Sequence, residues 1–212
     1  MSPRPSAVAV LPRARATANT RRAILDAAEH LLANVGEAGL SIREVCARAG
    51  VTAPTVYHHF GDKRALVDCV VAECFTRFDR TFRRRDLPAD PVERLRWSFD
   101  RYVEYGLAHP DHYRLMFQQP QPRPTSAGRA SYAGLERLVQ QASDAERLRA
   151  PVAAATAAFW AAVHGVTSLR IVGMLREAAP AAALVRDALI TQLTRPAPAS
   201  RRRRRSRGGS TT

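Results

Sequence analysis

Hydrophobic side chains recur every three or four residues along most of the chain, and no segment alternates hydrophobic and polar residues as a half-buried strand would. The fold is therefore predicted to be all-α, with about nine helices separated by Gly, Pro and capping residues. The predicted helices lie near residues 20–35, 42–49, 53–60, 62–84, 91–108, 111–118, 128–145, 151–177 and 181–194. Asp62 and Asp90 are expected to cap the starts of the fourth and fifth of these helices.

The segment 41–63 contains two short predicted helices around a tight turn. Ser41 and Glu44 match a capping box, in which each side chain accepts a backbone N–H of the other residue. Gly50 stands where the first helix must end, at a position that favours a left-handed backbone. Thr52 is expected to cap the second helix, and Pro54 falls in its first turn. This layout is typical of a helix-turn-helix DNA reader, although helical hairpins that bind no DNA carry the same signals.

The second helix of this segment places hydroxyl, phenol and imidazole groups opposite its apolar anchors, Val56 and Phe60. A short helix of this kind can enter the major groove and read base edges with its N-terminal residues. The residues predicted to contact bases, or to pack against them, are Thr52, Ala53, Pro54, Thr55, Tyr57 and His58. The residues predicted to contact phosphates or flanking DNA are Ser41, Arg43, His59 and Lys63.

Residues 20–70 resemble the N-terminal domain of the TetR family of transcriptional regulators. The resemblance is carried by residues 24–28, Gly36, Gly39, Ile42, Val45, residues 49–51, residues 55–57, His59, Phe60 and Lys63. His58 departs from the family pattern, because a second Tyr or Trp is common after the position of Tyr57. Two shorter blocks, 109–117 and 159–166, resemble the C-terminal domain of WHG-type TetR regulators.

The resemblance implies a homodimeric repressor that binds a palindromic operator and is released by a small-molecule effector. It also implies dimerisation through the last two long helices, near 151–177 and 181–194. Small residues recur at three- and four-residue steps from Ala153 to Gly165, which allows a close helix approach; from spacing alone, packing within one subunit remains an alternative. The residues predicted to line an apolar effector pocket are Trp97, Tyr102, Tyr105, Tyr113, Met116, Phe117, Phe159, Trp160 and His164. Each could instead be an ordinary core residue.

The formal net charge of +14 points to a polyanionic partner, but most of this charge lies at the two ends of the chain. Residues 1–22 carry five arginines and no acid, and residues 201–212 carry six arginines, so the folded part is close to neutral. The predicted organisation is a disordered basic arm (1–17), a helix-turn-helix domain (18–78), a helical effector-binding and dimerisation domain (79–195) and a disordered Arg-rich tail (196–212). The alternative function is an architectural DNA-binding protein that uses these arms without sequence preference or effector.

Other functional classes find little support in the sequence. No nucleophile-elbow, P-loop, zinc-protease or dinucleotide motif is present, so no enzyme and no cofactor is predicted. The three cysteines, Cys46, Cys69 and Cys74, have irregular spacing and predict neither a disulfide framework nor a metal site, although a thiol sensor remains open. No secretory signal or membrane-spanning segment is expected, with residues 151–175 the nearest candidate. The expected location is the bacterial cytoplasm, in association with the nucleoid.

Overall fold

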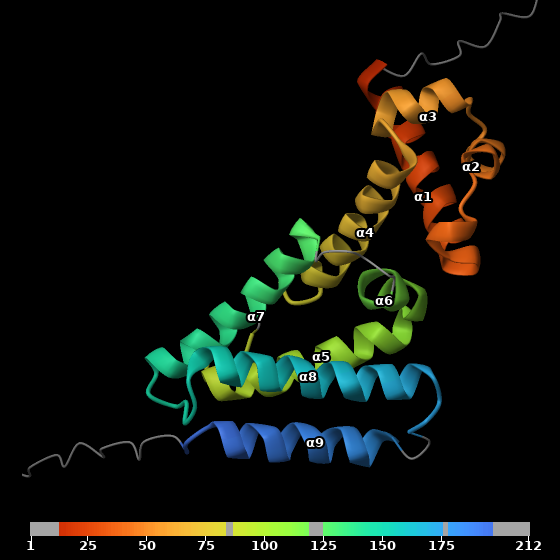
Figure 1. The fold of residues 1–212 in the computed structure, drawn as a ribbon. Helices are drawn as coiled ribbons and strands as arrows, with labels where there is room; N and C mark the ends of the chain where they lie inside the picture. The colour runs from red at the N-terminus through yellow and green to blue at the C-terminus, as the bar shows by residue number, and fades with distance from the viewer. Residues whose placement is uncertain (1–12, 84–86, 119–124, 176–177, 197–212) are drawn as a thin grey trace, which may run out of the picture.

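The computed structural model describes residues 13–83, 87–118, 125–175 and 178–196 (Figure 1). These residues form nine helices and no strand, which confirms the predicted all-α fold; an isolated bridge pairs Leu148 with Thr194. The helices are α1 (Arg13–Gly39), α2 (Ile42–Ala49), α3 (Ala53–Phe60), α4 (Lys63–Arg80), α5 (Pro91–Ala108), α6 (Pro110–Phe117), α7 (Ser126–Asp144), α8 (Val152–Ile171) and α9 (Ala178–Leu193).

The first three helices gather at one end of the molecule and α8 and α9 lie side by side at the other (Figure 1). Helix α4 runs between the two ends and packs against α1, α3, α6 and α7. Its apolar positions Leu66, Val70, Cys74 and Phe78 recur every four residues and are all buried. One helix therefore contributes to the packed core at both ends of the molecule.

Helix α5 is the centre of the C-terminal domain, where it packs against α6, α7, α8 and α9. Asp90 starts it as the sequence predicts: one carboxylate oxygen accepts the N–H groups of Val92 and Glu93 at 2.7 and 3.2 Å. The face that α5 turns to α8 carries Gly106, whose missing side chain allows Thr167 to approach. A buried glycine at this position therefore sets the spacing of the two helices.

Helix α8 is the one described helix that is long and apolar enough to span a membrane by length and composition, although only a third of its apolar window is buried within the subunit. It packs against α5, α7 and α9. Large apolar side chains stay exposed on α8 and α9, with Trp160 40%, Leu169 42% and Leu184 70% exposed. These three large apolar side chains are left partly uncovered by the described residues.

Several predicted boundaries differ from the structure. Helix α1 begins at Arg13, inside the predicted disordered arm, and continues past Val35 to Gly39 through a kink at Gly36, whose φ is 68°. Helix α8 ends at Ile171 and not near 177, because Gly173 adopts a left-handed φ of 72° and the Met174 N–H turns back to the carbonyl of Leu169. Helix α4 ends at Arg80, four residues early. Residues 1–12 and 197–212, which hold most of both predicted arms, lie outside the described residues.

Candidate nucleic-acid interface

Helices α2 and α3 are held by buried apolar side chains and by the turn between them. Val45 of α2 and Val56 of α3 are almost completely buried, and Phe60 closes the end of α3. Gly50 has φ 66° and ψ 34°, the left-handed conformation that the sequence predicts, and its N–H donates to the carbonyl of Cys46. The two helices pack against each other, and one side of α3 is left facing solvent.

The predicted side-chain caps of these two helices are wrong. Ser41 and Thr52 have the extended backbone of N-cap residues, but neither side chain accepts a backbone N–H of its helix. The Thr52 hydroxyl instead lies 3.0 Å from the hydroxyl of Thr55. A hydroxyl group rotates to whichever partner is nearest, so the sequence can indicate the backbone of a cap without fixing its hydrogen bond. The result is a pair of hydroxyls at the start of α3.

Helix α3 presents most of the residues predicted to contact bases on its open side. Tyr57 is 48% exposed, which is high for a large aromatic side chain, and Thr52, Pro54 and His58 are also exposed. Ala53, Thr55 and His59 are half-buried. The exposed groups can donate and accept hydrogen bonds and offer one aromatic surface, which is the chemistry needed to read base edges in the major groove.

The predicted flanking residues are divided between two helix starts. Arg43 is exposed in the first turn of α2, next to the half-buried Ser41. Lys63 is half-buried in the first turn of α4, behind Asp62, whose carboxylate accepts the Ala65 N–H at 2.7 Å. Asp62 therefore caps α4 as predicted. This hydrogen bond occupies one of the free backbone N–H groups in the first turn of α4.

Arg21 on α1 lies near this surface, although the sequence alone places it only in the basic end of the chain. Its guanidinium lies 5.1 Å from the centre of the Phe60 ring, and Nη2 lies 3.8 Å from the sulfur of Cys69. A cation over an aromatic face is an attractive contact. Arg21 thus ties α1 to the end of α3. This contact cannot be predicted from the sequence, because Arg21 lies far from the motif and no local pattern connects the two.

The residues predicted to line an effector pocket form one main cluster around His164 in the C-terminal domain. The imidazole Nδ1 lies 2.9 Å from the hydroxyl of Tyr113 and 3.1 Å from that of Tyr102. Phe117 and Trp160 pack against the same ring, with centroids 5.0 and 5.3 Å away. Burial lowers the pKa of His164, which favours a neutral ring with Nδ1 as acceptor. This cluster is a polar centre enclosed by aromatic rings.

The other predicted pocket residues lie apart from this centre. Phe159 packs on Phe99 and Trp97 on Phe82, while the Tyr105 hydroxyl bonds to His112. Met116 is buried on α6.

Within the His164 cluster, Trp160 lies closest to solvent, since it is 40% exposed and its ring meets Tyr132 of α7 edge to face. Whether any of these residues binds a ligand remains a prediction.

The cysteines differ in their surroundings. Cys74 is fully buried, and this burial raises the pKa of its thiol to about 12, so the free thiol stays protonated at neutral pH. A protonated thiol is a poor nucleophile. Cys46 and Cys69 are half-buried and all three are free. A redox role for Cys74 as a reactive thiolate is therefore disfavoured.

Two family models match the chain. The model described as "Bacterial regulatory proteins, tetR family" matches residues 24–70, and "Tetracyclin repressor-like, C-terminal domain" matches residues 95–193. An HTH-type transcriptional repressor of Mycobacterium tuberculosis is 42% identical over 72 residues, 34% of this chain and 38% of that protein. The class D tetracycline repressor of Escherichia coli is 39% identical over 57 residues, 27% of this chain and 26% of that protein. The chain thus matches under two fifths of the length of these curated relatives.

Solved structures extend the likeness over most of the chain. A Rhodococcus sp. RHA1 protein of unknown function superimposes with a TM-score of 0.71 at 28% identity, covering 83% of this chain and 96% of that one. A putative tetR family regulator from Shewanella sp. PV-4 gives a TM-score of 0.69 at 17% identity, with 84% and 99% covered. The regulator FadR from Bacillus subtilis, solved with stearoyl-CoA, gives 0.69 at 14% identity, with 80% and 97% covered. The last two show the fold alone.

Proposed function

This chain belongs to the TetR family of DNA-binding transcription regulators, and from that membership we propose that it is a homodimeric repressor of a palindromic operator, released by a small-molecule effector. The observation that carries the proposal is the exposed side of α3, on which Thr52, Tyr57 and His58 stand clear of the core. The proposed location of the protein is the cytoplasm, in association with the nucleoid.

In the proposed complex, the α3 helices of two subunits enter successive major grooves. Thr52, Thr55, Tyr57 and His58 contact base edges, and Ala53 and Pro54 make apolar contacts. Arg43 and Lys63, at the starts of α2 and α4, neutralise backbone phosphates, with Ser41 and His59 beside them. The half-buried positions of Lys63 and His59 are compatible with contacts at the edge of the groove.

The proposed dimer forms through α8 and α9. Its support is the exposed apolar stripe on these helices, where Ala153, Ala157, Ala161 and Leu169 of α8 and Leu184 of α9 face outward. Four helices, two from each subunit, would bury these residues in an isologous bundle. The same contact would fix the spacing of the two DNA-reading helices, since each is joined to the bundle through α4 and α5.

The proposed effector site is the cluster around His164, and the expected effector is medium-sized and mostly apolar with at least one polar group. The neutral imidazole and the two tyrosine hydroxyls supply the polar contacts. To release the operator, the effector must bind the DNA-incompetent arrangement more tightly than the DNA-bound one, since only differential affinity shifts a population. Phe78 of α4 packs edge to face on Tyr102, with ring centroids 5.2 Å apart, and provides a direct route from the cluster to α4.

The function is tested by selecting bound sequences from a library of random DNA duplexes at physiological salt. A dimeric helix-turn-helix regulator will enrich an inverted repeat with half-sites about 10 base pairs apart, centre to centre. Equal recovery of all sequences would instead identify an architectural protein that binds through its basic arms. The same selection at higher salt separates the two, because contacts to phosphates alone weaken steeply with salt.

A further inference from the structure

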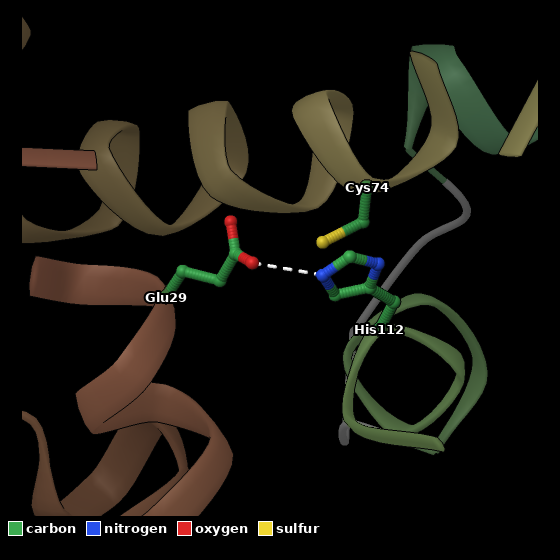
Figure 2. Close-up of side chains that lie close together, drawn as sticks. All are labelled: Glu29, Cys74 and His112. Atoms are coloured by element: carbon green, nitrogen blue, oxygen red, sulfur yellow. Dashed lines mark hydrogen bonds and ion pairs between the residues drawn. The ribbon is translucent and has the colours of Figure 1, made fainter. Parts of the chain in front are cut away.

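A cluster of three side chains lies at the junction of α1, α4 and α6, apart from both the DNA-reading surface and the His164 cluster. Glu29 comes from α1, Cys74 from α4 and His112 from α6. Figure 2 shows the Glu29 carboxylate and the His112 imidazole facing each other beside the Cys74 sulfur. Glu29 Oε1 lies 2.8 Å from His112 Nε2, and one ligand atom from each residue lies within 4.8 Å of the other two.

We propose that Glu29, Cys74 and His112 bind a divalent transition-metal ion, with Zn²⁺ the best fit and a fourth position left for water. A thiolate, an imidazole and a carboxylate are the ligand types that zinc takes in proteins. The thiolate disfavours Mg²⁺ and Ca²⁺, which prefer oxygen ligands. The site therefore selects by chemistry among the common metal ions.

The distances between the ligand atoms suit this ion after small side-chain movements. Zinc bonds of about 2.0–2.3 Å in tetrahedral geometry place ligand atoms about 3.4–3.6 Å apart. In the structure the separations run from the 2.8 Å hydrogen bond up to at most 4.8 Å. Metal entry would open the Glu29–His112 pair by about half an ångström and draw the Cys74 sulfur inward. Neither movement requires a helix to shift by a full turn.

A second layer of contacts already orients the imidazole. The Tyr105 hydroxyl lies 3.0 Å from His112 Nδ1, so Nε2 is directed to Glu29 and Cys74. The ring of His109 stacks on His112, with centroids 5.1 Å apart and planes 13° apart. Metal-binding histidines usually have a hydrogen-bond partner on the ring nitrogen away from the metal. Tyr105 fulfils that role in this cluster.

The protons balance when the metal binds. In the neutral tautomer that suits these contacts, Nε2 carries the proton toward the carboxylate oxygen 2.8 Å away and Nδ1 accepts from Tyr105. On metal binding, Nε2 becomes a ligand, the ring proton moves to Nδ1 by exchange with water, and Tyr105 becomes the acceptor. The Cys74 thiol loses its proton to solvent. Zn²⁺ with one thiolate, one carboxylate and a neutral imidazole has zero net charge, which reduces the cost of burying it.

Arg77 competes with the metal for Glu29. Its Nη1 donates to the same Oε1 at 2.9 Å and lies 3.3 Å from His112 Nε2. Arg77 also has two other carboxylates in reach, since Nε lies 3.5 Å from Glu73 and Nη2 lies 4.0 Å from Asp26. Glu73 and Asp26 can keep their ion pairs with the Arg77 guanidinium when the Glu29 carboxylate binds the metal. The competition predicts that Arg77→Gln binds the metal more tightly than the wild type.

Occupancy of this site would link α1 of the DNA-binding domain to α6 of the C-terminal domain through α4. Glu29 and His112 already form a direct contact between the two domains, and metal bonds would make that contact more rigid. An effect of the ion on operator affinity rests on the proposed function. The existence of the site does not, and the experiment addresses the site alone.

The test is a titration of the reduced, full-length protein with Co²⁺, a spectroscopic substitute for Zn²⁺. The wild type is expected to develop a sulfur-to-cobalt charge-transfer band that saturates at one equivalent and disappears on addition of Zn²⁺. Cys74→Ser is expected to lose this band, while the matched controls Cys46→Ser and Cys69→Ser keep it. No band in the wild type under excess Co²⁺, or a band that persists in folded Cys74→Ser, would overturn the proposal.

Two further variants keep the test decisive if Cys74→Ser does not fold. Glu29→Gln and His112→Gln retain the thiol and each remove one ligand. Each is expected to weaken Co²⁺ binding by more than the roughly 10- to 100-fold that loss of an outer contact costs. Unchanged Co²⁺ affinity in either folded variant would show that the metal is bound elsewhere, and would equally overturn the assignment.

Discussion

Adding one methyl group at Gly106 is expected to force α5 and α8 apart. A Cβ built at this position overlaps Thr167 Cγ2 and lies 3.3 Å from Tyr113 Cδ2. The Thr167 methyl cannot rotate away without loss, because its hydroxyl donates to the carbonyl of Val163 at 2.7 Å and the residue is fully buried. Overpacking of this kind costs about 1–3 kcal/mol, and the better helix propensity of alanine offsets up to about 1 kcal/mol. Gly106→Ala should therefore lower the free energy of unfolding by about 1–2 kcal/mol.

A second substitution tests whether the overlap is the cause. Thr167→Ser removes the clashing methyl, keeps the hydroxyl, and alone should cost about 1 kcal/mol for the lost buried group. In the double variant the new alanine methyl occupies the vacated space, so stability should return close to that of the wild type. Urea unfolding followed by circular dichroism, at one fixed protein concentration, measures all four proteins. A Gly106→Ala protein as stable as the wild type, or a double variant with simply additive losses, would refute this account of the α5–α8 contact.

Two other predictions concern the dimer and a helix cap. Leu184→Glu should convert the protein to monomer in sedimentation experiments, because it places a charge from each subunit in the proposed α8–α9 interface. The control Val35→Glu, at a 50% exposed position on α1, should remain dimeric. A Leu184→Glu protein that is still dimeric would contradict the proposed interface. The hydrogen bond from Arg147 holds the pKa of Asp90 in the folded protein below its ordinary value. The Asp90 carboxylate therefore stabilises the fold at pH values above the ordinary pKa, and this stabilisation is lost as the pH falls through the folded-state pKa. The free energies of unfolding of wild type and Asp90→Asn should differ by under about 1 kcal/mol, since the Asp90–Arg147 pair is partly exposed. This difference should be constant from about pH 7 to 5 and shrink below about pH 4. A difference that grows on acidification would contradict the role of the Asp90 charge.

The fold can be predicted from the sequence because its signals are local. Helical periodicity, the glycine at position 50 and the aspartate caps at 62 and 90 each act within one or two turns, and the structure confirms them. The end of α8 is not predictable in this way because Gly173 lies inside a run that remains apolar to both sides. The hydrogen bonds of Ser41 and Thr52 are not predictable because a motif indicates backbone conformation and leaves the hydroxyl rotamer open.

Contacts between distant segments leave no such local signal. Glu29 and His112 are 83 residues apart, and the irregular cysteine spacing argues against a metal site. Only the packing of α1, α4 and α6 brings these ligand atoms together. Similarly, Arg21 belongs by sequence to a basic end of the chain, and only the fold places it over Phe60 at the end of α3. The positions of α3 side chains, in contrast, follow directly from helix geometry, and the exposure of Tyr57 agrees with the predicted reading face.

The central claim is that specific DNA binding depends on the exposed side of α3 and not on the bulk positive charge of the chain. Its most direct test is the ratio of affinities for the selected operator and for random DNA, measured at one salt concentration for wild type, Tyr57→Ala and the matched control Tyr132→Ala. Tyr132 is 38% exposed on α7, away from the α2–α3 surface. We predict that Tyr57→Ala remains dimeric and loses its preference for the operator, as removal of a base contact worth about 1–3 kcal/mol in each subunit requires. A Tyr57→Ala protein that keeps the wild-type ratio would contradict the claim.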